Sequence, residues 1–367
     1  MRFIERKISF GILELPSLMM LLLSMVVPSS YLPIIIAISL LIILINSVSY
    51  IELTILSCGL FFYLIHFFNG YNDIRFLLPF ILLTYSKHFE IPKHVELEKK
   101  INIIYLLWLV YVISFITATA TSSDFAESSL YNSYYSELAN NFIYDINDLT
   151  SYRVGSFYFN PNQLAYVYMV LSIVAFNLKG IKPYVIIAGF VIFMLTQSRT
   201  LAIFILYYFM IYLILNRSTK LIIITIVVLI SFFITANYYN FGGIRVLAHA
   251  NSTIEHALFK IYLMDNFIKL DSLYIIFGSG YNKDLSFDAD LGSFLYYYGI
   301  IAGPILYFFC LYSLRRYIPY SMLPMIVLIT YYGTIFSNTR MVTILGAFSV
   351  INIVWRIKIQ SATRLRD

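Results

Sequence analysis

Apolar segments of roughly bilayer-spanning length recur throughout this chain, and short polar or charged turns separate them. A spanning helix needs about 20 mostly apolar residues, so the gaps between charges and turn residues predict about twelve spans. The predicted spans are Gly11–Val27, Tyr31–Ile45, Ile51–Phe68, Ile74–Ser86, Asn102–Ala120, Pro161–Asn177, Pro183–Gln197, Thr200–Leu215, Leu221–Ala236, Leu291–Leu314, Ile318–Ser337 and Met341–Trp355. With 60% hydrophobic and 12% charged residues, the chain also differs from soluble domains, which are about a quarter charged. We therefore expect an all-α polytopic membrane protein that forms one integral membrane domain over residues 1–367.

Lysine and arginine are unevenly distributed between the two predicted sides of the membrane. Short cytoplasmic loops carry an excess of these residues, and a cytoplasmic N-terminus places 17 of the 25 on the inner side. The inner set is Arg2, Arg6, Lys7, Lys87, Lys93, Lys99, Lys100, Lys179, Lys182, Arg217, Lys220, Arg315, Arg316, Arg356, Lys358, Arg364 and Arg366. No cleavage pattern follows the first apolar run, so we expect it to stay as a helix. The prediction is a multi-pass protein with both termini in the cytoplasm.

Two long polar stretches interrupt the helix pattern, Thr121–Asn160 and Asn237–Asp290, and both fall on the predicted outer side. The first is rich in acids and tyrosines, which suit sugar hydroxyls and sugar faces, although tyrosine belts at membrane interfaces are commoner. The second contains an apolar periodic stretch typical of a helix lying on the membrane surface. We expect the function to lie between or beneath these loops.

Several classes of chemistry have no support in the sequence. Metal-ligand spacings are absent apart from the pair Asp288–Ala289–Asp290, and no glycine loop of a nucleotide-binding kind occurs. We therefore predict no metal, no cofactor and no ATP-driven step. The net charge of +6 is explained by a basic inner face beside anionic lipid, so we predict no nucleic-acid partner.

Five arginines lie on the predicted outer side, where the charge bias disfavours them, and four of these are candidates: Arg153, Arg199, Arg245 and Arg340. A guanidinium group keeps its charge and donates two hydrogen bonds to one phosphate, so such a cluster suits a lipid diphosphate. The alternative is that each arginine pairs with an acidic loop residue or a lipid headgroup. Two of them occupy tight outer hairpins, Gln197–Thr200 and Ser337–Arg340, and Arg199 is the strongest single candidate.

A second motif contains Gly155 and the run Asn160–Pro161–Asn162. Proline is favoured at the first position of a helix and asparagine just before it, so a helix should begin near Pro161, and a cap alone explains the motif. Candidates for a proton acceptor are Asp290 and His249, with Asp288, His256 and the acids of the first loop as alternatives that the sequence does not separate.

Taken in order, these motifs resemble those of the superfamily of Wzy-type O-antigen polymerases and O-antigen ligases. The resemblance covers about residues 153–303. It rests on Arg153, Gly155, Asn160, Pro161, Asn162 and Ala165, then Ser198–Arg199–Thr200, then Arg245, then Gly278, Gly280, Asp290, Leu295, Gly299 and Gly303. Ligases usually carry a histidine before the helix that contains Leu295, Gly299 and Gly303, where this chain has Asp288–Ala289–Asp290, so the polymerase is favoured.

The resemblance implies a fold similar to membrane glycosyltransferases of the GT-C class and a metal-independent, inverting glycosyl transfer. The donor would be an undecaprenyl-diphosphate-linked oligosaccharide at the outer face of the bacterial inner membrane, with a flippase and a chain-length regulator as partners. Arg199 and Arg245, helped by Arg153 and Arg340, would neutralise the diphosphate, and Gly155, Asn160 and Asn162 would help to bind substrate. Asp290 or His249 would be the base or a positioning group.

Two other readings stay open. A lipid-linked oligosaccharide flippase or transporter would also show many helices, but it should place ionisable residues in mid-helix along a substrate path. Glu14 is the main exception to otherwise clean helix interiors, and it lies close to the inner surface. A purely structural or signalling membrane protein would leave the outer arginines unexplained.

Overall fold

The computed structural model describes residues 2–46, 49–68, 70, 73–88, 95–121, 161–179, 183–196, 198–216, 265, 267–269, 272–278, 290–315, 322–332, 335–336 and 338–363. Every regular element in these ranges is a helix, so the predicted all-α fold is confirmed there. By length and composition, four helical segments in these ranges can cross a membrane: Ser29–Asn46, Tyr50–Phe68, Asp290–Leu314 and Thr339–Lys358. The total of twelve spans and the likeness to the GT-C class stay predictions.

Each predicted span that the structure describes overlaps a helix. The bounds of the helices are α1 Arg2–Val26, η1 Ser29–Tyr31, α2 Leu32–Asn46, α3 Tyr50–Phe68, η2 Ile74–Leu77, α4 Leu78–His88, α5 Val95–Thr121, α8 Pro161–Lys179, α9 Pro183–Thr196, α10 Arg199–Asn216, α14 Ser272–Phe277, α15 Asp290–Leu314, α16 Leu323–Tyr332 and α17 Thr339–Thr363. Three helices continue through charged residues past the predicted bounds: α1 begins at Arg2, α5 begins at Val95 and α17 ends at Thr363. The predicted span Leu221–Ala236 lies outside the described residues. For the span predicted at Ile318–Ser337, the structure describes α16 over 10 residues.

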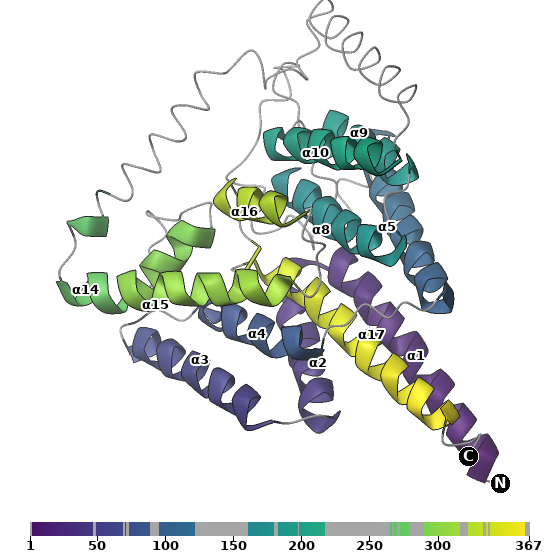
Figure 1. Ribbon diagram of the computed structural model, residues 1–367, viewed down its shortest axis with the longest axis horizontal. Helices are drawn as coiled ribbons and strands as arrows, with labels where there is room; N and C mark the ends of the chain where they lie inside the picture. The colour runs from purple at the N-terminus through teal and green to yellow at the C-terminus, as the bar shows by residue number, and fades with distance from the viewer. Residues whose placement is uncertain are drawn as a thin grey trace, which may run out of the picture. The chain divides into compact units, whose positions relative to one another are not determined.

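Two compact units make up the chain, Met1–Leu109 with Tyr262–Asp367, and Val110–Ile261, and the boundary falls within α5. In the first unit α17 is the central helix, packed against α1, α2 and α4 (Figure 1). Its interior supplies core residues such as Ile344, Ala347 and Ile351. The single membrane domain over residues 1–367 stays a prediction.

α15 is broken at Gly299, whose φ of 77° is a conformation that L side chains rarely adopt. In a straight helix the 13 residues from Phe294 to Tyr307 span about 20 Å, yet their ring centroids are 5.8 Å apart. The two arms, 290–298 and 300–314, therefore bend sharply toward each other (Figure 1). The span expected at Leu291–Leu314 is long and apolar enough to cross a membrane, and the structure adds the break at Gly299.

Close backbone approaches at glycine hold this bend. A Cβ on Gly299 would overlap the carbonyl oxygen of Ile276 at the end of α14, and one on Gly303 would press on the carbonyl of Phe294. Nε2 of His66 donates to the carbonyl of Tyr297 at 2.6 Å, which ties α3 to the break. Gly299 and Gly303, two of the glycines that carried the family resemblance, thus have a packing role here.

The second unit contains a packed set of helices, α8, α9 and α10. The hydroxyl of Tyr168 on α8 donates to the carbonyl of Val185 on α9, and Gly189 leaves room for that tyrosine. α9 ends at Thr196 and α10 begins at Arg199, so the tight hairpin expected at Gln197–Thr200 is confirmed.

Candidate functional site

The sequence-predicted candidates that fall among the described residues share one structural position, the start of a helix. Asn162 and Arg340 are the second residues of α8 and α17, and Arg199 and Asp290 are the first residues of α10 and α15. α8 begins at Pro161, as the proline motif predicts. A helix N-terminus has unpaired N–H groups and a partial positive charge, so it favours anions nearby.

Asp290 is fully buried, with 0% of its surface exposed. Its Oδ2 atom accepts hydrogen bonds from the backbone N–H groups of Ile335 at 2.5 Å and Phe336 at 3.0 Å. These two residues lie in the turn between α16 and α17. The carboxylate therefore anchors this turn to the start of α15, which is a position unlike that of a solvent-facing base.

Arg340 is buried as well, and its guanidinium points to the C-terminal end of α1. It donates to the carbonyl oxygens of Ser24 at 3.2 Å, Met25 at 2.9 Å and Val27 at 2.7 Å. Carbonyls at a helix C-terminus lack partners within the helix and carry partial negative charge. Arg340 supplies donors and positive charge there, so it joins α17 to α1.

Side chains at the start of α17 complete this arrangement. Oδ1 of Asn338 accepts from the N–H groups of Arg340 at 3.0 Å and Met341 at 3.3 Å, so Asn338 is the N-cap of α17. Asp290 binds the N–H groups of the turn between α16 and α17. Arg340 lies on the helix that follows this turn and binds α1.

For the other candidate residues the structure describes at most the position of the backbone. Arg199 is placed by its backbone at the first position of α10, after the buried Ser198, whose carbonyl accepts from the N–H of Ala202 at 3.0 Å. Five predicted site residues lie outside the described residues: Arg153, Gly155, Asn160, Arg245 and His249. Of Asn162 only the helical backbone is described.

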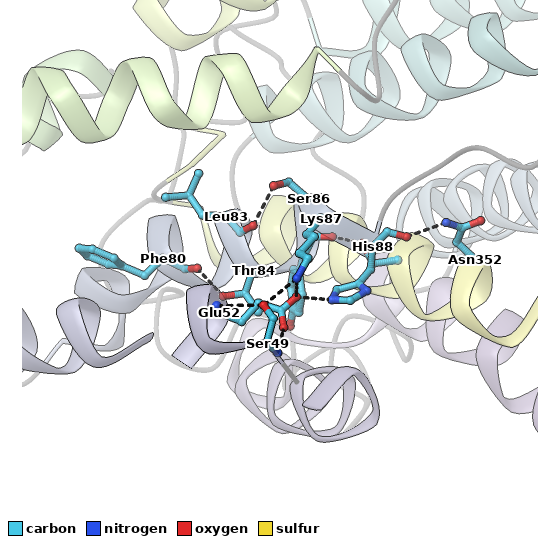
Figure 2. Close-up of polar contacts among 11 residues, drawn as sticks. Ser49, Glu52, Phe80, Leu83, Thr84, Ser86, Lys87, His88 and Asn352 are labelled. Atoms are coloured by element: carbon cyan, nitrogen blue, oxygen red, sulfur yellow. Dashed lines mark hydrogen bonds and ion pairs between the residues drawn. The ribbon is translucent and has the colours of Figure 1, made fainter. Parts of the chain in front are cut away.

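Sequence reasoning missed a buried acid–base cluster where α3 begins and α4 ends (Figure 2). Glu52, 1% exposed, lies 2.6 Å from Nε2 of His88 and 3.4 Å from Nζ of Lys87. Ser49 and Glu52 also form a capping box, in which the N–H of Ser49 donates to Glu52 at 2.8 Å and the N–H of Glu52 to Ser49 at 3.4 Å. The spacing Ser-x-x-Glu before an apolar run was the signal that could have revealed it.

The same cluster continues into α17, because Nδ2 of Asn352 donates to the backbone carbonyl of His88 at 2.6 Å (Figure 2). Lys87 donates to the hydroxyl of Ser49 at 2.6 Å. α3, α4 and α17 are therefore joined at one end by polar contacts. Each charged group has an oppositely charged or hydrogen-bonding neighbour, an arrangement typical of a structural lock.

A second charged network joins α1, α5 and α17. Glu14 is paired with Lys100 and, at 3.1 Å, with Lys358, and Lys100 is also 3.1 Å from Glu96. Burial opposes the charged form of Lys100, but hydrogen bonds to Glu14 and Glu96 and their charges outweigh it and raise its pKa. Glu14, the exception noted in the sequence, is thus engaged in ion pairs.

Comparisons with models of protein families, with curated proteins and with solved structures found no match. The family resemblance therefore stays a prediction based on sequence motifs.

Proposed function

We propose that this protein is an O-antigen polymerase, which joins undecaprenyl-diphosphate-linked repeat units of a surface polysaccharide at the periplasmic face of the bacterial inner membrane. The terminal-sugar hydroxyl of one repeat unit attacks the anomeric carbon of the other glycan. The bond from that carbon to the diphosphate oxygen breaks, and undecaprenyl diphosphate leaves with the electron pair. The hydroxyl proton passes to a base, and the anomeric configuration inverts.

One observation carries the proposal: Asn162 and Arg199, two of the motif residues, stand in the first turn of α8 and α10, which pack against each other in the second unit. The charge bias of the loops predicts that both of these helices start on the outer side. Helix N-termini stabilise negative charge and bind phosphate groups through their N–H donors. A reaction that releases a diphosphate on that side would use such an arrangement.

Arginine supplies the strongest support for the leaving group. Arg199, with Arg153 and Arg245, is assigned in this proposal to the diphosphate, because a fixed cation that forms two hydrogen bonds matches phosphate geometry. A preorganised donor of this kind contributes about 3 kcal/mol to transition-state stabilisation. His249 is the candidate proton acceptor.

A lipid-linked oligosaccharide flippase is the second candidate, and the buried pair Glu52–His88 is the observation in its favour. A transport path requires ionisable groups along the membrane interior. Here Glu52 lies in the first turn of α3 and His88 is the last residue of α4, and both are engaged in contacts between helices. This position favours the polymerase.

Deletion of the gene in its native host, followed by gel electrophoresis of the surface glycan, separates these activities. A polymerase deletion should leave a single repeat unit on the lipid core. An unsubstituted core with lipid-linked polymer accumulating would indicate a ligase, and an unsubstituted core without that polymer would favour the flippase. An unchanged ladder of chain lengths would contradict all three.

A further inference from the structure

Two residues that the sequence assigned to the chemistry are directed into the protein. We propose that Asp290 and Arg340 are positioning residues, which lock the turn between α16 and α17 to α15 and to α1, and that neither side chain takes part in the glycosyl transfer itself. The inference rests on the proposed polymerase function, and it narrows the groups that contact substrate.

The contacts of Asp290 fit this role. Its Oδ2 atom holds the N–H groups of Ile335 and Phe336 at 2.5 and 3.0 Å, and the residue has no exposed surface. Hydrogen bonds to a carboxylate are about twice as strong as those between neutral groups. A general base must instead reach the proton of the acceptor hydroxyl, directly or through one water.

The contacts of Arg340 lead to the same conclusion. Its guanidinium donates to three carbonyl groups at the end of α1, at 2.7 to 3.2 Å, and only 5% of the residue is exposed. Binding a diphosphate would require these donors to leave α1. The carbonyls of the buried residues Ser24 and Met25 would then lose hydrogen bonds that water does not replace, which is costly.

Aromatic packing also holds the turn between α16 and α17 against α15. The ring of Phe336 lies 6.1 Å from Phe294 and 5.8 Å from Tyr307, so it contacts both arms of the broken helix α15. The turn is therefore held by α15 through Asp290 and through these rings, while α17 is held to α1 through Arg340. The arginines left for the diphosphate are Arg153, Arg199 and Arg245.

The variants Asp290→Asn and Asp290→Ala separate positioning from chemistry. The asparagine oxygen still accepts from both N–H groups, whereas alanine removes the acceptor. Amide hydrogen exchange at Ile335 and Phe336 should stay protected in Asp290→Asn and lose protection in Asp290→Ala. With purified protein and lipid-linked repeat units, Asp290→Asn should keep at least about a tenth of the transfer rate with an unchanged pH profile, whereas Asp290→Ala should lose about 100-fold.

A matched control is Asp265→Ala, because that aspartate is paired with Lys269 but is 55% exposed, and its loss should change neither readout. Normal exchange protection with lost transfer in Asp290→Asn would overturn the proposal and assign the carboxylate to the chemistry. If the amides of Ile335 and Phe336 stay protected in Asp290→Ala, the claim that Asp290 holds the turn is wrong. If the wild-type protein transfers no glycan, the proposed function fails, and the exchange data still decide whether Asp290 holds the turn.

The double variant Asp290→Ala/Arg340→Gln tests the second residue. If both side chains fix one turn, the combined loss of rate should be clearly smaller than the product of the two single losses. If the rate loss of the double variant equals the product of the two single losses, the shared role is contradicted. Arg340 would then again be a candidate for binding the diphosphate.

Discussion

Three charged side chains buried in the described part of this protein are bound to backbone groups at helix ends. Asp290 and Glu52 accept from N–H groups, and Arg340 donates to carbonyls at the end of α1. The first and last turns of a helix leave such groups without partners, and inside a membrane protein water does not supply them. A buried charge in these positions therefore stabilises the ends of two elements at once.

Glu52 gives a direct test of this view. Glu52→Ala removes the capping-box bond and the contacts with Lys87 and His88, and we expect it to lower the free energy of unfolding by about 3 kcal/mol. The matched variant Glu96→Ala removes an acid that also pairs with lysines but is 60% exposed, and it should cost less than about 1 kcal/mol. Unfolding in mixed detergent micelles measures both values, and equal losses would contradict the argument.

α15 is the element in which sequence and structure differ most. Its run of 25 residues is apolar and long enough to cross a bilayer, yet Gly299 divides it into two arms. Non-helical backbone at membrane depth is tolerated where protein covers it, and α14, His66 and the buried tyrosines at 296–298 cover this break.

Gly299→Ala tests whether the break is required. Alanine would be strained at the positive φ of Gly299 and would also overlap the carbonyl of Ile276. Gly70→Ala is the control, since Gly70 has a φ of 87° but nothing within 4 Å of the added Cβ. We expect a loss of about 1 kcal/mol at Gly70 and at least twice as much at Gly299, measured by unfolding in detergent. A smaller loss at Gly299 would show that the break can relax.

The positions of most helices were predictable, because apolar runs in the sequence mark them, but the bounds of α1, α5 and α17 were not, since these helices continue through charged residues. The break in α15 was not, since its cause is the backbone of α14 at Ile276, which no local pattern around Gly299 reveals. The roles of Asp290 and Arg340 depend on backbone atoms 45 and more than 300 residues away in sequence. Residue type and spacing do not reveal contacts with backbone atoms that are so distant in the sequence.

Across the described part of the first unit, polar contacts gather by predicted side. Glu14 joins Lys100 and Lys358, which the charge bias assigns to the inner side, and Lys87 of the same side meets Ser49. Asp290 and Arg340 act at helix ends that are predicted to be outer. α1 and α17 run antiparallel between these two ends (Figure 1). The cytoplasmic location of the termini stays a prediction.

Reconstitution decides whether the whole molecule is a polymerase. The purified protein is placed in proteoliposomes with one defined undecaprenyl-diphosphate-linked repeat unit, and glycan length and released undecaprenyl diphosphate are measured together. We predict a ladder of lengthening glycans, one lipid diphosphate released for each bond formed, and much shorter products from Arg199→Lys, which keeps charge but loses two-pronged phosphate binding. Unchanged repeat units with no diphosphate released would contradict the polymerase assignment.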